Sequence, residues 1–192
     1  MLALQMQTIK PLACAFLVLL FAIPSYGQEP LKPGPQAGEQ AYYFHPLFVH
    51  GKHAGKKVSI TQYLHYDYGR PYALVFIRST DDATLKLIRK LDEAAEDRKR
   101  ISIGLVMLSD DAKIVAHLEK LVAKEKFKAT TVAVYDNLQG PKTNALAKEA
   151  EATVVFVQRT QVFANFAFQK TAITDAAIQT VIDKVKTIKA KQ

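Results

Sequence analysis

The sequence is almost free of cysteine: Cys14 is the only one among its 192 residues. A single thiol cannot form an internal disulfide, so the chain is not a small disulfide-stabilised scaffold. The sequence also contains no G-x-S-x-G nucleophile elbow, no glycine-rich phosphate loop, no zinc-finger spacing and no internal repeat. These absences argue against the motif-bearing hydrolases, P-loop nucleotide-binding proteins and zinc-finger domains.

The first thirty residues have the pattern of a secretory signal peptide. Lys10 precedes the apolar run LACAFLVLLFAI, and Ser25 and Gly27 place small residues three and one positions before a cut after Gly27. The run is shorter than the roughly 20 residues of a membrane-spanning helix, although a retained N-terminal anchor remains an alternative. We therefore predict a signal peptide over residues 1–27, no stable membrane span after its cleavage, and a secreted or periplasmic location.

Cleavage would remove Cys14, which lies inside the apolar run and not after it, where a lipid-attachment cysteine would stand. The mature chain would then begin near Gln28 without any cysteine, and thiol chemistry would be excluded. Residues 28–41 carry several prolines and glycines and predict a flexible leader. Residues 42–192 are enough for one globular domain with a single core.

The charge of the chain is positive, with a formal net charge of +8 at pH 7. The basic residues alternate with acidic ones at helical spacing, as in RKLDEAAEDRKR, which is typical of solvated helix faces. Aromatic residues are not interleaved with the basic ones as in a single-strand binding groove. We therefore expect no nucleic-acid partner, and an envelope protein or an anionic surface remains open as a partner.

Short apolar runs and amphipathic segments follow one another along the rest of the chain. Five runs predict strands at 72–79, 101–109, 130–136, 153–159 and 162–168, and the last two, only about two residues apart, predict an antiparallel hairpin. Apolar residues at helical spacing predict helices after Ser79, after Ser109 and from Thr174. Gly140-Pro141 predicts a turn into a further helix over 143–151. The alternation predicts an α/β domain with a parallel portion and an antiparallel edge.

The phrase GKKVSITQYL at Gly55–Leu64, the strand YALVFIRS with its following helix, and the closing hairpin and helix resemble the thioredoxin-like superfamily. The sequence is most similar to its redoxin branch, which includes peroxiredoxins and secreted thioredoxin-family proteins. The resemblance covers roughly residues 47 to 188. It implies a three-layer α/β/α fold whose mixed sheet has central parallel strands and a C-terminal antiparallel hairpin.

The same resemblance implies active-site positions that this chain fills with other residues. Where the family has a Cys-x-x-Cys pair after the strand, the sequence has Asp81 to Thr84, and neither cysteine is present. The cis-proline of the family would fall just ahead of Thr153, where Ala152 stands, and a non-proline peptide there is expected to be trans. Asp81 follows two hydroxyl residues, which favours a helix-capping role, with paired-carboxylate catalysis as the alternative.

Three histidines are grouped near the start of the domain. His45, His50 and His53 fall within FHPLFVHGKH, and imidazoles grouped in this way could bind zinc or copper. Their spacing matches no closed metal site, so surface histidines are the favoured interpretation and no resident metal or cofactor is expected.

Two hypotheses for function follow from the sequence. The preferred one is a secreted, cysteine-free thioredoxin-like domain that is redox-inactive, has no catalytic residues and serves as a binding or structural module in the cell envelope. The alternative is a redoxin-family oxidoreductase or another enzyme with a non-thiol, metal-assisted site.

Overall fold

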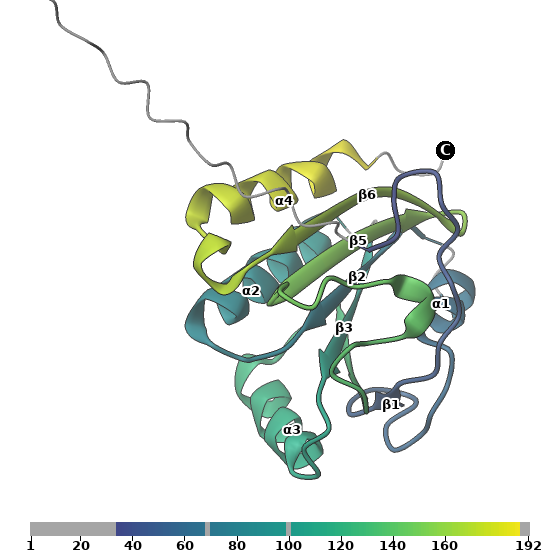
Figure 1. The fold of residues 1–192 in the computed structure, drawn as a ribbon, viewed down its shortest axis with the longest axis vertical. Helices are drawn as coiled ribbons and strands as arrows, with labels where there is room; N and C mark the ends of the chain where they lie inside the picture. The colour runs from purple at the N-terminus through teal and green to yellow at the C-terminus, as the bar shows by residue number, and fades with distance from the viewer. Residues whose placement is uncertain (1–33, 68–69, 99–100, 189–192) are drawn as a thin grey trace, which may run out of the picture. The chain divides into compact units, whose positions relative to one another are not determined.

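The computed structural model describes residues 34–67, 70–98 and 101–188, which form one body around a six-stranded sheet (Figure 1). The signal peptide predicted for residues 1–27 lies outside the described residues. The strands are β1 (Leu47–Phe48), β2 (Tyr72–Ile77), β3 (Ser102–Leu108), β4 (Thr130–Tyr135), β5 (Ala152–Gln158) and β6 (Gln161–Phe168). The helices are α1 (Ile60–Gln62), α2 (Asp82–Arg98), α3 (Ile114–Glu125) and α4 (Asp175–Thr187), with the short turns η1 (Tyr63–Asp67), η2 (Lys142–Asn144) and η3 (Lys170–Ala172).

The sheet has the mixed topology that the sequence predicts. Its order is β1-β4-β3-β2-β5-β6. Strands β2, β3 and β4 are parallel, β5 runs antiparallel to β2, and β5 and β6 form the antiparallel hairpin. All five predicted strands are therefore confirmed. The structure adds the two-residue edge strand β1, which the apolar runs in the sequence did not predict.

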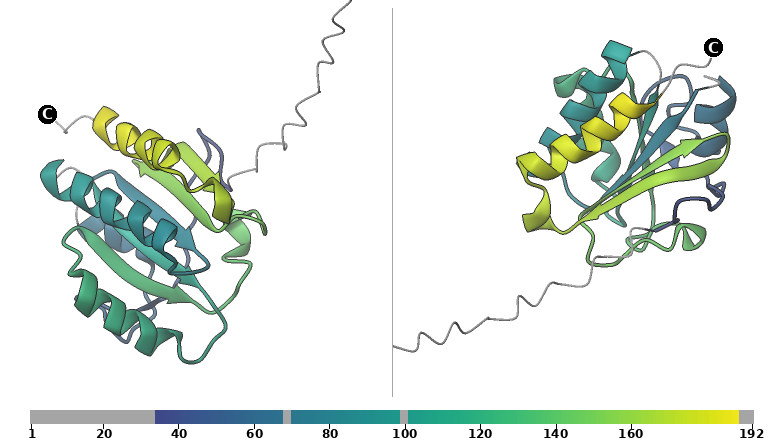
Figure 2. Two further views of the ribbon diagram at one scale, coloured as in Figure 1. Left: turned by 90° about the vertical axis from the view of Figure 1, so that its left-hand side faces the viewer. Right: turned by 90° about the horizontal axis from the view of Figure 1, so that it is seen from above.

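The alternation of side chains along β2 divides the core into two layers. Ala73, Val75 and Ile77 pack against α2, α3 and α4 on one face of the sheet. Tyr72 and Phe76 point to the other face, which is covered by α1, η1 and the loops that flank them (Figure 2). The three-layer fold is thus confirmed, although the second helical layer is thin. Within the described residues, no helix is long and apolar enough to cross a membrane.

The hairpin between β5 and β6 turns at Arg159 and Thr160. Both residues have positive φ angles, 51° and 70°, which is the backbone of a two-residue type I′ turn. This geometry matches the twist of the strands but disfavours a β-branched residue such as threonine. Arg159 and Thr160 are therefore unfavourable residues for this turn, and the pairing of β5 with β6 keeps them in the turn conformation.

The segment from Gly34 to Ala41 lies along β6. The Gly38 amide donates to the Val162 carbonyl (2.8 Å), and the Val162 amide donates to the Glu39 carbonyl (2.8 Å). The Ala41 amide donates to the Thr160 carbonyl at the hairpin turn (2.8 Å). The sequence assigns residues 28–41 to a leader; within its described part, Gly38, Glu39 and Ala41 have backbone partners in the β5–β6 hairpin.

The helix expected over residues 143–151 is wrong. Only η2 forms there, and it ends at Asn144; the next residue, Ala145, adopts a left-handed conformation with a φ of 43°. The alanines, the lysine and the two glutamates of this segment favour a helix. Tertiary contacts override that preference: Leu146 is buried in the core, and the Ala147 and Ala150 carbonyls accept hydrogen bonds from the Arg78 side chain.

Candidate functional site

The candidate site lies at the edge where the parallel strands β2, β3 and β4 end. Strand β2 has β3 on one side and β5 on the other, so the chain order reverses beside it. Such a reversal at the carboxyl ends of strands is the usual place for a ligand site in an open α/β sheet. Residues 78–81 connect β2 to α2 here, and the start of β5 lies next to them.

Asp81 caps helix α2. Its Oδ1 accepts a hydrogen bond from the Thr84 amide (2.9 Å), and its carbonyl accepts from the Leu85 amide (2.8 Å). Its Oδ2 lies 3.4 Å from the Lys170 ammonium. The hydrogen bond from the Thr84 amide is the largest of the influences that lower the pKa of Asp81, and Lys170 adds to it. Asp81 is therefore a carboxylate at neutral pH, fixed at the position where the helix end favours a negative charge.

The residue three positions further on is buried. Thr84 has 0% of its surface exposed, and its side chain contributes to lowering the pKa of the Asp81 carboxylate. Thr84 therefore supports the cap and presents no surface of its own to a ligand.

The two positions assigned on β5 lie at the same edge. Ala152 pairs with Ile77 and Thr153 with Phe76, which places both beside the end of β2. Both residues are buried, with 0% and 2% exposure, and no peptide bond in the described residues is cis. The structure therefore brings Ala152 and Thr153 close to the β2–α2 junction, but as interior strand residues that present little surface to a ligand.

Arg78 organises this edge, and sequence reasoning missed it. Its Nε donates to the Ala150 carbonyl (2.7 Å), one terminal nitrogen donates to the Ala147 carbonyl (3.1 Å), and the other donates to the Leu138 carbonyl. Burial lowers the pKa of Arg78, although Glu151 opposes this effect. The guanidinium thus ties the loop between β4 and β5 to β2. The only signal in the sequence was a charged residue directly after an apolar strand.

The histidines do not form a common site. His45 lines a depression at the carboxyl edge, whereas His50 lines a groove at the other end of the sheet. The ring of His53 packs edge-on against Tyr63, with ring centroids 5.1 Å apart. In the described ranges, no group of three histidine, cysteine, aspartate or glutamate side chains is placed to hold a metal ion. Another histidine, His117 on α3, has its Nε2 3.0 Å from the Thr80 hydroxyl and so faces the β2–α2 junction.

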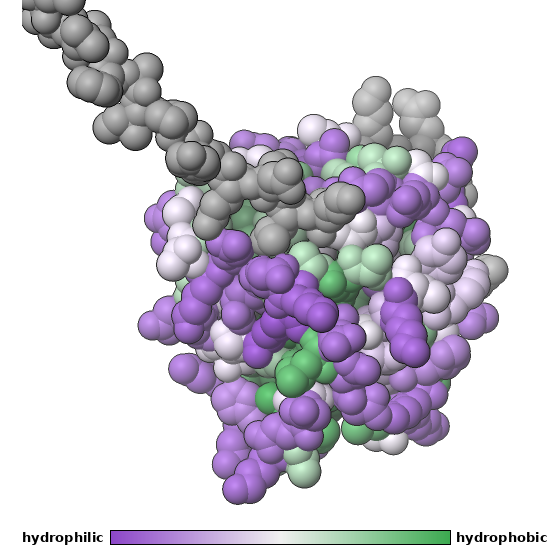
Figure 3. Space-filling view, viewed as in Figure 1, coloured by the Kyte–Doolittle hydropathy of each residue, from purple (hydrophilic) through white to green (hydrophobic). Residues whose placement is uncertain are grey.

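A depression of about 520 Å³ lies at the carboxyl end of β4. Tyr43 and Leu138, which are 51% and 48% exposed, stand at or near it, and Tyr42 is 46% exposed. They are the large apolar side chains that remain exposed among the described residues. The surface seen in Figure 3 is otherwise largely hydrophilic, with a few apolar residues near its centre. The lining residues are Tyr43, Phe44, His45, Lys57, Tyr135, Asp136, Asn137, Gly140, Pro141, Lys142 and Thr143.

Comparisons with known proteins identify the fold. No protein-family model and no curated protein matches the sequence. Among solved structures, the chain is similar to a candidate protein disulfide isomerase from Bacteroides thetaiotaomicron, with 11% identity, 83% of this chain and 93% of that chain covered, and a TM-score of 0.59. It is also similar to a peroxiredoxin-like protein from Aquifex aeolicus, with 12% identity, coverage of 81% and 89%, and a TM-score of 0.55.

A third similar structure is a secreted disulfide oxidoreductase from Mycobacterium tuberculosis, homologous to DsbE, with 12% identity, coverage of 76% and 96%, and a TM-score of 0.52. At these identities the likeness concerns the backbone and not the active-site chemistry. Together with the sheet order and the helix that follows β2, it confirms the architecture implied by the sequence. The chain has the thioredoxin-like fold, of the kind seen in redoxins and DsbE-like proteins.

Proposed function

We propose that this chain is an exported, cysteine-free thioredoxin-like domain that performs no thiol redox chemistry and binds a partner protein of the cell envelope. The observation that carries the proposal is the side chain at the start of α2. Asp81 occupies the N-cap, the position where a helix end would stabilise a reactive thiolate, and holds the Thr84 amide with its carboxylate. A carboxylate cannot form a mixed disulfide, and the buried Thr84 hydroxyl cannot resolve one.

The surface at the carboxyl end of β4 supports a binding role. The Arg78 clamp fixes the β4–β5 loop, so the depression beside Tyr43 is preorganised and a partner would lose little free energy in ordering it. Exposed aromatic and leucine side chains are the residues that protein interfaces use as anchors. Export is supported by the apolar N-terminal run and by the similarity to a secreted oxidoreductase.

The redox part of the proposal is tested with insulin-reduction and peroxide-reduction assays on residues 28–192. We expect no turnover above the uncatalysed rate. The double variant Asp81→Cys/Thr84→Cys should gain disulfide-exchange activity, because the helix start would then stabilise a thiolate. A matched control, Asp110→Cys/Lys113→Cys, places the same spacing ahead of α3 and should be much less active. Turnover by the cysteine-free protein itself would refute the proposal.

The binding part is tested by site-specific photo-crosslinking in the envelope fraction. A photoreactive phenylalanine analogue at Tyr43 should give a discrete protein adduct, whereas the same analogue at Lys120, exposed on α3, should not. Equal labelling from both positions, or none from Tyr43, would argue against a partner at the carboxyl edge.

A further inference from the structure

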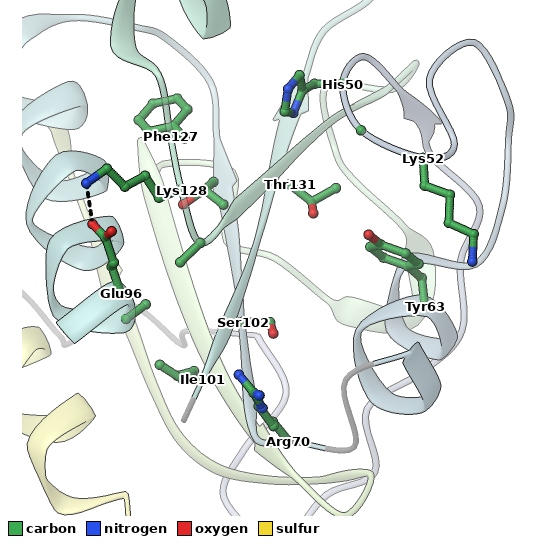
Figure 4. Close-up of a pocket in the computed structure, with 14 residues that line it drawn as sticks. His50, Lys52, Tyr63, Arg70, Glu96, Ile101, Ser102, Phe127, Lys128 and Thr131 are labelled. Atoms are coloured by element: carbon green, nitrogen blue, oxygen red, sulfur yellow. Dashed lines mark ion pairs between the residues drawn. The ribbon is translucent and has the colours of Figure 1, made fainter. Parts of the chain in front are cut away.

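The amino ends of the parallel strands form the end of the molecule opposite the carboxyl edge. Strands β2, β3 and β4 begin here, the β5–β6 hairpin turns here beside the start of β2, and α2, α3 and α4 end here (Figure 1). A groove of about 760 Å³ opens among these segments (Figure 4). The groove shares no lining residue with the depression beside Tyr43, so an inference drawn from this end does not rest on the proposed function.

Four exposed cationic side chains lie at this end and come from separate segments of the chain. Arg70 precedes β2, Lys124 lies in the last turn of α3, Lys126 caps that helix, and Arg159 lies in the hairpin turn. None of the four belongs to an ion pair within the described residues. These four residues are called the basic end.

The acidic side chains near the basic end are mostly paired with other basic residues. Figure 4 shows one of these pairs, in which the Lys128 ammonium is directed to Glu96. Asp97, in the last turn of α2, is exposed and belongs to no ion pair in the part of the chain that the structure describes. Four unpaired cations therefore outnumber one unpaired anion among the described side chains. The ion pairs are Glu96–Lys128 (2.9 Å), Glu125–Arg89 (2.6 Å) and Asp183–Lys186 (2.6 Å).

Two of the four cations occupy backbone positions that disfavour them. Lys126 and Arg159 have φ angles of 54° and 51°, in the left-handed region. Glycine or asparagine is the usual residue at a helix end or a tight turn of this kind, because glycine adopts this conformation without strain. Stability of the fold therefore does not account for a basic residue at either position. Residues held in strained conformations cluster at functional sites.

The carboxyl edge carries acidic residues at the other ends of the same helices. Asp82 and Asp175 lie in the first turns of α2 and α4. The helix dipole favours this distribution at helix ends, but Arg70 and Arg159 lie outside the helices. Charge is thus segregated along the direction of the strands, and an anionic surface attracts one end of the molecule more than the other.

We propose that the basic end docks on an anionic phospholipid surface and leaves the depression beside Tyr43 directed away from that surface. Because the four cations come from separate segments, a broad anionic surface meets all of them at once, whereas a small anion reaches one or two. Each lysine or arginine near an anionic leaflet strengthens binding by about fivefold. Attraction of this kind weakens in salt, because salt shortens the distance over which charges interact.

The proposal is tested by flotation of residues 28–192 with phosphatidylcholine vesicles, with and without phosphatidylglycerol. The protein floats only with vesicles that contain phosphatidylglycerol. Its partition coefficient falls by about tenfold or more between about 0.1 M and about 1 M salt, because the Debye length shortens from about 10 Å to about 3 Å.

Two double variants separate the basic end from net charge. Lys126→Gly/Arg159→Asn weakens partitioning by about tenfold or more, and the protein stays folded because both substitutions suit the left-handed backbone. The control Lys113→Gln/Lys148→Gln removes the same charge from exposed positions near the carboxyl edge and weakens partitioning by less than about twofold, because these positions lie beyond the reach of the leaflet charge.

A measurement on the unmodified protein identifies the end that meets the lipid. In ¹⁵N–¹H spectra with phosphatidylglycerol nanodiscs that carry a paramagnetic lipid, the amide signals of Arg70 and Lys126 broaden more than those of Asp81 and Asn137. The proposal is overturned if the protein does not float with phosphatidylglycerol vesicles at low salt, if phosphatidylcholine alone binds it as well, or if the two double variants weaken binding equally. Equal broadening at both ends, or retention by soluble polyglutamate without vesicle binding, would also overturn it.

Discussion

Replacing Arg78 with methionine tests whether a single guanidinium holds the carboxyl edge together. Methionine keeps an unbranched apolar stem but removes three hydrogen bonds, to the carbonyls of Leu138, Ala147 and Ala150. A hydrogen bond that involves a charged group contributes about 1.5–3 kcal/mol when it is buried. Arg78 is only partly buried, so water would replace some of these contacts. We expect the variant to lose about 3 kcal/mol of unfolding free energy.

The assay is urea unfolding followed by far-UV circular dichroism, since the sequence contains no tryptophan. Arg78→Lys keeps the charge but lacks the planar fork, so it should recover only part of the loss. Arg70→Met is the matched control; because Arg70 is exposed, it should change the unfolding free energy by less than about 0.5 kcal/mol. Hydrogen exchange should also accelerate at the Ala150 amide. The reasoning is refuted if Arg78→Met costs no more than the control, or if lysine restores full stability.

Three further predictions concern packing, turn geometry and pH. Gly104→Ala should lower the unfolding free energy by about 1–2 kcal/mol in urea, because the added Cβ would lie 2.7 Å from a methyl group of Leu64 in η1. An unchanged unfolding free energy would contradict this prediction and show that Leu64 can move aside. The double variant Arg159→Asn/Thr160→Gly should raise the unfolding free energy by about 1 kcal/mol and the calorimetric melting temperature by about 2–4 °C. The reason is that both positions have positive φ angles, which asparagine and glycine adopt readily in a type I′ turn. A lower melting temperature would contradict the turn assignment. Hydrogen bonding to Arg89, at 2.6 and 2.7 Å, lowers the pKa of Glu125 below its ordinary 4.5. The ion pair therefore stabilises the fold above about pH 4.5, and this stabilisation is lost as the pH falls through the lowered pKa of Glu125. Glu125→Gln should lower the unfolding free energy by about 1 kcal/mol at pH 7 and leave it unchanged near pH 2. A loss of unfolding free energy that is the same at both pH values would exclude this linkage.

The parts of the fold that could be predicted from the sequence are those with local patterns. Strand β2 is an unbroken run of buried residues, and α4 carries apolar residues at helical spacing after a threonine cap whose side chain accepts from the Ala177 amide. These patterns depend on residues close together in the chain, and they were sufficient to predict five strands, a parallel portion of the sheet and the closing antiparallel hairpin. The capping role of Asp81 was predictable for the same reason.

What the sequence could not reveal depends on contacts between distant residues. The segment over 143–151 has a composition that favours a helix. It does not form one, because its Ala147 and Ala150 carbonyls accept hydrogen bonds from the side chain of Arg78, which lies more than sixty residues earlier in the chain. The groove of Figure 4 likewise joins Lys52, Arg70 and Lys128 from three segments. No local spacing relates these positions, because the sheet order brings them together.

The segment Gly34–Ala41 covers one flank of the hairpin. Its backbone occupies hydrogen-bonding groups of β6 that would otherwise face outward at the end of the sheet. Uncovered strands of this kind invite another polypeptide to join them. Loss of these few residues by proteolysis would thus expose the backbone of β6 as a template for self-association.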